Sequence, residues 1–204
     1  MLGVSPRSGT TLLAEAMVAC FEIDLFHDHE ARIFSPPPSA GDIYLTKAPR
    51  DILLAEAALE RSSELIVVHM TRDHPRFVVV RYEDLVADAD AVQSALMARM
   101  PFLTKTESFS DFHKVAKPSS STMQALNGVR PISAEGAHKW RKHLARVAGQ
   151  IAQHGSIAED LIEFGYDRND AWLRELDDIE PDRSSSHWPE YFTKESIARM
   201  LRAP

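Results

Sequence analysis

The chain has 204 residues, of which 44% are hydrophobic and 26% charged, a composition typical of a globular domain with its own core. Its formal net charge of −7 argues against general nucleic-acid binding, so any anion site must be a local basic pocket. The single cysteine, Cys20, excludes an internal disulfide framework and fits a reducing compartment. No apolar run approaches the roughly 18 residues of a membrane span, and the first residues do not resemble a signal peptide. We therefore expect a soluble cytoplasmic protein with no membrane partner.

The first part of the chain alternates apolar runs with helical patterns. The expected elements are a strand at 1–4, a helix at 9–20, a proline-marked loop at 35–42, a strand at 43–49 and a helix at 51–61. Residues 21–34 mix apolar and polar side chains without a clear period.

The second part begins with two nearly continuous apolar runs, 64–72 and 76–85, which are typical of buried parallel strands. Further along, we expect a helix at 87–100, a loop at 103–121, a helix at 141–164 that Gly155 is placed to divide and Gly165 to end, a linker at 181–187, and a short helix capped by Thr193.

This alternation predicts an α/β fold, a three-layer domain with a central parallel sheet. Only Asp73, His74 and Pro75 separate the two apolar runs, whereas parallel strands need a connection of about a dozen residues or more. The runs therefore form a hairpin, or a segment is absent from the sequence near 73–76. Because both runs are apolar on both faces, we favour the missing segment. The prolines at 36–38 mark a candidate second junction, over 36–41.

The most informative segment is GVSPRSGTTLLAEAM, residues 3–17. An apolar strand, a Pro-, Ser- and Gly-rich turn and a helix follow one another, which is the arrangement of a phosphate-binding loop. Thr10 stands where a nucleoside-triphosphate loop has its lysine, and the basic residue is Arg7. The loop is thus suited to a phosphate but lacks the lysine that reaches a triphosphate. The alternative is a Gly-Ser turn before an ordinary helix.

The segment PRSGTT strongly resembles the 5′-phosphosulfate loop of sulfotransferases that use 3′-phosphoadenosine 5′-phosphosulfate (PAPS). The resemblance covers most of residues 1–166, in separate blocks, and leaves 167–204 as a C-terminal extension. It implies that the loop residues hold the 5′-phosphosulfate of the donor: Arg7, Ser8, Gly9, Thr10 and Thr11. PAPS has no γ-phosphate, so the resemblance also implies that no metal is needed.

Three later blocks resemble the parts of this family that surround the nucleotide. VVHMTRD contains Arg72, which the resemblance assigns to the 3′-phosphate of the donor, and RYEDL contains Tyr82, placed near the nucleotide. RPISAEGAHKW resembles the segment with a second 3′-phosphate residue, here Lys139, beside Trp140. The serine that the family has several residues past the arginine, and the second basic residue that it often has there, are not found in this chain.

The resemblance leaves the catalytic base open. HDHEARIF resembles the Glu-Glu-Thr-Arg segment of the tyrosylprotein sulfotransferase branch, which places Glu30 at the base position, with His29 and then His27 as alternatives. The cytosolic branch has a histidine after Lys-Thr; here the corresponding stretch is TKAP, which keeps Lys47 but lacks the histidine. Lys47 is the candidate that assists the leaving group or the sulfuryl oxygens.

The sequence therefore predicts a PAPS-dependent sulfotransferase that sulfates a hydroxyl acceptor and releases 3′,5′-diphosphoadenosine. The acceptor is open among glycan, peptide, lipid and small molecule, and no nucleic-acid or membrane partner is expected. The rival enzyme is a small kinase or other P-loop NTPase, which would require the lysine that the loop lacks. The rival without catalysis is a nucleotide-binding scaffold that kept the loop.

Overall fold

The structure, a computed structural model, describes residues 9–27, 41–47, 59–60, 66–69, 76–137, 139–163 and 165–184. The chain divides into two compact units, Met1–Ala134 and Glu135–Ala203, which are described separately. The expected strand at 1–4 and the final helix after Thr193 lie outside the described residues, as does all but 59–60 of the expected helix at 51–61. The domain boundary at 166, inferred from the resemblance, stays a prediction.

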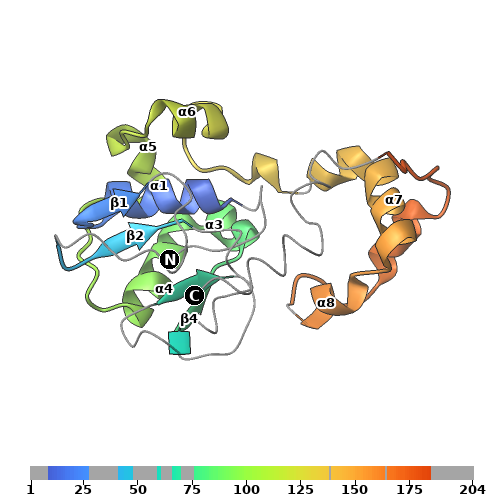
Figure 1. Cartoon of the computed structure of the whole chain (residues 1–204), viewed down its shortest axis with the longest axis horizontal. Helices are drawn as coiled ribbons and strands as arrows, with labels where there is room; N and C mark the ends of the chain where they lie inside the picture. The colour runs from blue at the N-terminus through green and yellow to red at the C-terminus, as the bar shows by residue number, and fades with distance from the viewer. Residues whose placement is uncertain are drawn as a thin grey trace. The chain divides into compact units, whose positions relative to one another are not determined.

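The first unit contains two pairs of short parallel strands (Figure 1). β1 (Leu25–His27) pairs with β2 (Tyr44–Thr46), and β3 (Val67–His69) pairs with β4 (Phe77–Val79). Residue pairing runs from Leu25 with Tyr44 to His27 with Thr46. The mixed α/β class with parallel strands is therefore confirmed, while the described strands form two separate pairs rather than one central sheet.

The strand pairing excludes one alternative and adds one strand that the sequence did not predict. The hairpin alternative for the apolar runs is wrong, because β3 and β4 are parallel, with Val67 opposite Phe77. β1 lies within residues 21–34, where the sequence showed no period, because a strand of three residues is too short to show one. Its pairing is supported by Asp24, whose Oδ2 accepts from the backbone N–H groups of Asp42 and Ile43, both at 2.8 Å.

The helical segments of the first unit whose bounds the structure describes are α1 (Thr10–Cys20), α3 (Tyr82–Ala87), α4 (Ala89–Arg99), the 3₁₀ turn η2 (Phe109–Asp111), α5 (Phe112–Val115) and α6 (Ser120–Leu126). Residues 59–60 are also helical. The helix at 9–20 and the helix at 87–100 are confirmed as α1 and α4. The expected strand at 76–85 instead ends at Val79, and α3 follows it. The expected loop at 103–121 is partly helical, since it contains η2 and α5.

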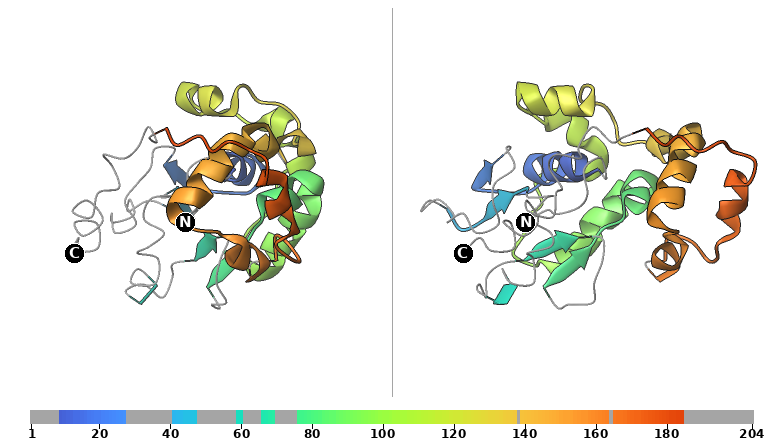
Figure 2. Two further views of the ribbon diagram at one scale, coloured as in Figure 1. Left: turned by 90° about the vertical axis from the view of Figure 1, so that its right-hand side faces the viewer. Right: turned by 45° about the vertical axis from the view of Figure 1, so that its right-hand side comes forward.

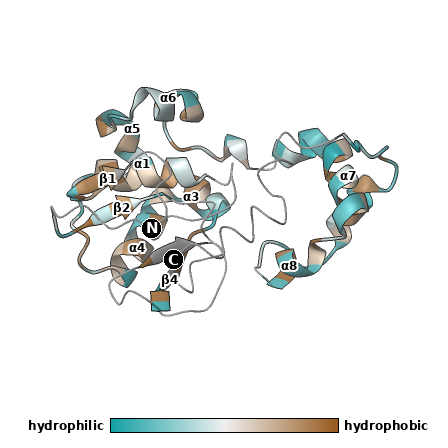
Figure 3. Cartoon of the chain, viewed as in Figure 1, coloured by the Kyte–Doolittle hydropathy of each residue, from teal (hydrophilic) through white to brown (hydrophobic). Residues whose placement is uncertain are grey.

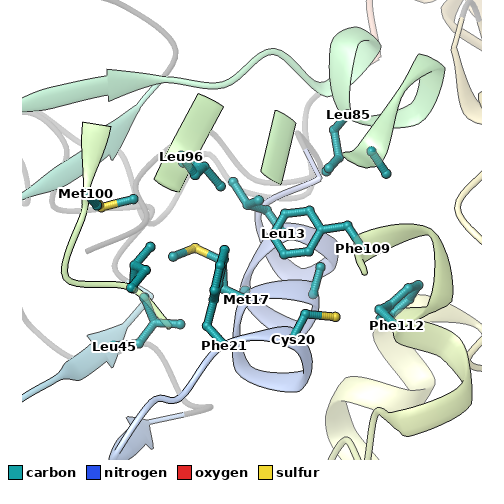
Figure 4. Packing of buried hydrophobic residues seen from close by; sticks show 14 of the residues in the cluster. Leu13, Met17, Cys20, Phe21, Leu45, Leu85, Leu96, Met100, Phe109 and Phe112 are labelled. Atoms are coloured by element: carbon teal, nitrogen blue, oxygen red, sulfur yellow. The ribbon is translucent and has the colours of Figure 1, made fainter. Parts of the chain in front are cut away.

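The core of the first unit is built around α1, which is apolar on nearly all sides (Figure 4). α1 packs against β2, and also against α5 and α6 (Figure 2). The rings of Phe21 and Phe109 meet edge to face, with centroids 5.5 Å apart. Cys20 belongs to this core: its thiol donates to the Ser108 carbonyl at 3.4 Å, and burial raises its pKa to about 11. The core therefore encloses α1 from Leu13 to Cys20.

The second unit is helical in its described part, with hydrophilic colours along much of it (Figure 3). Its elements are η4 (Lys139–His143), α7 (Leu144–His154), α8 (Ala158–Glu163) and η5 (Ala171–Leu176), while η3 (Ala134–Gly136) spans the boundary. The expected helix at 141–164 is divided at Gly155, whose φ of 93° is in the left-handed region. The backbone at Asp182 packs tightly on α7 at Gly149. A Cβ added to Gly149 would lie 1.9 Å from the Asp182 carbonyl oxygen.

Candidate functional site

The candidate site lies at the start of α1. Gly9 is the N-cap residue, with φ 85° and ψ 5°, and its carbonyl accepts from Leu13 N–H at 3.0 Å. The first turn of α1 contains no acidic side chain, and Gly9 provides no side-chain cap. The positive end of the helix dipole is therefore not neutralised by a carboxylate of its own first turn, which suits a bound anion.

The second component is Lys47, the residue directly after β2. Its ammonium Nζ donates to Thr11 Oγ1 at 3.3 Å, and the contact is partly buried. Thr11 is the second residue of α1, so this hydrogen bond brings a cation to the first turn of the helix. Residues 11 and 47 come from different elements, and the packing of β2 on α1 is what allows them to meet.

The third component is Tyr82, the first residue of α3. A Cβ added to Gly9 would lie 2.4 Å from Tyr82 Cδ2 and 3.1 Å from Cε2, so the aromatic ring lies directly against the backbone of residue 9. The left-handed φ and this close ring both exclude a larger residue at position 9. The glycine is thus required both by the turn into α1 and by the tyrosine.

Three of the segments singled out in the sequence therefore meet at one place: the start of α1, the end of β2 and the start of α3. The described members of the predicted site in this unit are Gly9, Thr10, Thr11, Lys47 and Tyr82. Thr10 is 8% exposed, while the others are half-buried. The grouping is a geometric finding, and the role of each side chain in binding or catalysis stays a prediction.

The remaining predicted residues of the first unit lie outside the described residues: Arg7, Ser8, His29, Glu30 and Arg72. The backbone of His27 is described, as the last residue of β1 and the partner of Thr46. Glu30 follows three positions after His27 in the sequence, and Lys47 comes directly after Thr46. The register thus places the end of β1 next to the end of β2.

Lys139 belongs to the second unit, where it begins η4 and is exposed. The neighbouring Trp140 packs edge to face with Trp172, at 5.9 Å between ring centroids, and the Arg141 guanidinium lies 4.6 Å from the centre of the Trp140 ring. Arg141 also donates twice to Glu175, each at 3.0 Å, and this hydrogen bonding lowers the pKa of the Glu175 carboxyl. Trp140, the residue after Lys139, is thus held in place by a cluster of Trp172, Arg141 and Glu175.

Two polar groups close to the site in sequence were not singled out beforehand. Glu15 on α1 is only 5% exposed, and Thr46 Oγ1 is a buried hydroxyl without a hydrogen-bond partner. Glu15 could have been noticed as the one carboxylate in the apolar stretch LLAEAM, four residues after Thr11. Nothing in the sequence marks the burial of Thr46, because it depends on what covers the other face of β2.

The comparisons with known proteins add no relative. Models of protein families, curated proteins and solved structures were each compared with the chain, and none of them matches. Within the described ranges, no three His, Cys, Asp or Glu side chains gather as metal ligands would. In the same ranges, no helix has both the length and the apolar character to cross a membrane.

Proposed function

We propose that the protein is a PAPS-dependent sulfotransferase that sulfates a hydroxyl acceptor. The observation that carries the proposal is the meeting of Thr11, Lys47 and Tyr82 at the start of α1. The resemblance to sulfotransferases selected these residues from three separate blocks of sequence. Chance similarity of three blocks gives no reason for them to lie together in space.

The described residues fit the handling of a phosphosulfate group. The start of α1 has no side-chain cap and directs backbone N–H groups outward, and Thr10 and Thr11 stand on its first turn. The ammonium of Lys47, held by Thr11, supplies a positive charge at the same end of the helix. Such an arrangement stabilises the charge that collects on the leaving phosphate in the transition state.

In the proposed reaction, the acceptor oxygen attacks the sulfur of PAPS as the bond from sulfur to the bridging phosphate oxygen breaks. The acceptor proton passes to the base, for which Glu30 is the first candidate and His29 the second. The bonding electrons leave with the 5′-phosphate, so the products are the sulfate ester and 3′,5′-diphosphoadenosine. Lys47 and Arg7 are the cations assigned to the leaving phosphate.

The finer parts of the proposal concern the whole fold and the 3′-phosphate. A three-layer α/β domain with one central parallel sheet would extend the two parallel pairs seen in the first unit. Arg72 and Lys139 would bind the 3′-phosphate, for which the fork of arginine and the point charge of lysine are both suited. The missing serine of the family pattern makes these two cations the only candidates from the resemblance.

A thermal-shift experiment tests the proposal against its rivals. We expect 3′,5′-diphosphoadenosine to raise the melting temperature by several degrees at saturating concentration, with little effect of AMP or ATP. Equal stabilisation by AMP would contradict the assignment of a 3′-phosphate site, and stabilisation by ATP with Mg²⁺ would favour an NTPase. If the protein binds PAPS but releases no diphosphoadenosine with any acceptor mixture, the result would favour a nucleotide-binding scaffold without catalysis.

A further inference from the structure

Two lysines of the second unit lie side by side on η4. This element is a 3₁₀ helix, so residues three apart are eclipsed, and Lys139 and Lys142 project from the same side of it, about 6 Å apart along its axis. Both residues are exposed, and within the described part of the chain neither makes a hydrogen bond or an ion pair. Two like charges at this spacing repel each other, so an anion bound between them relieves an unfavourable interaction.

The other two sides of η4 are anchored on η5. Trp140 packs edge to face on Trp172, and Arg141 donates twice to Glu175. Trp172 and Glu175 are themselves three residues apart on a 3₁₀ helix, so they share one side of η5. Because contacts on two sides fix the rotation of this short helix, the lysine pair is held on the side that is exposed.

We propose that Lys142 joins Lys139 in binding the 3′-phosphate of the nucleotide. This inference rests on the proposed function, which assigns that phosphate to Arg72 and Lys139. The chain lacks the serine and the second basic residue that the family pattern has after the arginine, whereas the geometry of η4 adds a cation beside Lys139. A phosphate monoester carries about 1.5 to 2 negative charges at neutral pH and three acceptor oxygens, so it can accept from two ammonium groups at once.

The lysine pair gives Lys142 a part in the choice of nucleotide. The 3′-phosphate is the group that distinguishes PAPS and diphosphoadenosine from AMP and ATP. Two ammonium groups on flexible stems can adjust to a single phosphate. The Arg141 guanidinium is instead engaged by Glu175 and lies 4.6 Å from the centre of the Trp140 ring, so it serves to hold η4 in place. Lys142 is thus a specificity-determining residue rather than a catalytic one.

Calorimetry on the full chain tests this role with two ligands, diphosphoadenosine and AMP. Lys142→Met removes the charge and should weaken the binding of diphosphoadenosine by roughly tenfold, the lower end of the effect of a hydrogen bond to a charged group, because the site is exposed. The affinity for AMP, which has no 3′-phosphate, should stay unchanged. Lys142→Arg keeps the charge and should retain most of the affinity for diphosphoadenosine. If Lys142→Met aggregates, Lys142→Gln gives the same comparison.

A matched control is Arg174→Met, which removes an exposed positive charge from η5. Arg174 projects from a different side of η5 than Trp172 and Glu175, so its loss should leave both affinities nearly unchanged. Unchanged binding of diphosphoadenosine by Lys142→Met, or an equal loss for AMP or in Arg174→Met, would overturn the inference while leaving the proposed function in place. Failure of the wild type to bind diphosphoadenosine would instead overturn the proposed function, and this inference with it.

Discussion

The ring of Tyr82 occupies the space that a side chain at residue 9 would need, because an added Cβ on Gly9 would lie 2.4 Å from its Cδ2. This contact joins two segments far apart in the sequence, the turn into α1 and the junction of β4 with α3. It fixes the start of α1, where Thr11 meets Lys47. The geometry of the candidate site thus depends on a contact between an aromatic ring and a backbone.

The first prediction concerns this contact. Gly9→Ala should be destabilised for two reasons, the left-handed φ of 85° and the collision of the new Cβ with Tyr82. Gly128→Ala is a matched control, since Gly128 has a φ of 88° but no atom within 4 Å of an added Cβ. Backbone strain alone costs roughly 1–3 kcal/mol, so both variants should lose stability in urea unfolding. Gly9→Ala should lose about 1–3 kcal/mol more because of the overpacking.

The second prediction concerns the hydrogen bond between Lys47 and Thr11. Thr11→Val keeps the shape of the side chain but removes the acceptor, so the Lys47 ammonium is no longer held at the first turn of α1. We expect the affinity for diphosphoadenosine to fall by roughly ten- to hundredfold, the effect of one hydrogen bond to a charged group. Lys47→Met should have a larger effect, and Thr11→Val should add little to it. Full additivity of the two changes, measured by calorimetry, would show that the residues act separately.

The third prediction concerns metals. Sulfuryl transfer from PAPS should continue in EDTA, because the charge on the leaving phosphate is assigned to Lys47 and Arg7 and the donor has no γ-phosphate. The measurement is the release of diphosphoadenosine with and without the chelator. Loss of activity in EDTA that Mg²⁺ restores would point to the rival NTPase chemistry.

The fourth prediction uses Asp90 on α4, whose side chain accepts from Ser110 N–H at 3.0 Å and from Ser110 Oγ at 2.7 Å. These hydrogen bonds lower the pKa of the Asp90 carboxyl from its usual 3.8. A carboxyl whose pKa is lower in the folded state stabilises the protein at pH values above the pKa of the unfolded state. This stabilisation is lost as the pH falls through the pKa of the folded state. Wild type should therefore be more stable than Asp90→Asn near pH 6, and the difference should shrink below about pH 4. A difference in urea midpoint that persists unchanged at pH 2.5 would contradict this origin.

The sequence predicted those parts of the fold that depend on local pattern. Runs of good helix-forming residues predict α1 and α4. Asp88 caps the N-terminus of α4, where its side chain accepts a hydrogen bond from Ala91 N–H at 2.9 Å. α6 was missed because its serines favour turns as readily as helix starts. The strand β1 was missed because three residues carry no period, and only its pairing with β2 identifies it.

In the candidate site too, the sequence predicted the residues but not the contacts between them. Gly9, Thr11, Lys47 and Tyr82 were each chosen from short sequence blocks, but no block says that the tyrosine packs on the glycine or that the lysine binds the threonine. These are tertiary contacts. Glu15 was missed because helical periodicity reports which positions are apolar and does not show that a carboxylate among them is buried. Its depth became evident only once the elements around α1 were in place.

The last prediction concerns the base. Glu30→Gln keeps the size and hydrogen-bonding capacity of the side chain but cannot accept a proton at neutral pH. If Glu30 activates the acceptor, turnover should fall by roughly 10²–10⁴-fold, while the affinity for diphosphoadenosine should stay nearly unchanged because other residues hold the nucleotide. Arg7→Ala should instead lower both donor affinity and turnover, since it removes a cation assigned to the donor.

The informative comparison is with His29→Ala and His27→Ala, which alter the alternative bases in the same segment. Both should keep most of the turnover if Glu30 is the base, and the rate of Glu30→Gln should not recover at higher pH, because glutamine has no titrating group there. A near-normal rate for Glu30→Gln, together with a collapse for either histidine variant, would move the proton transfer to histidine. That outcome would refute the similarity to the tyrosylprotein branch at this segment while leaving the donor site, which rests on Thr11 and Lys47, unaffected.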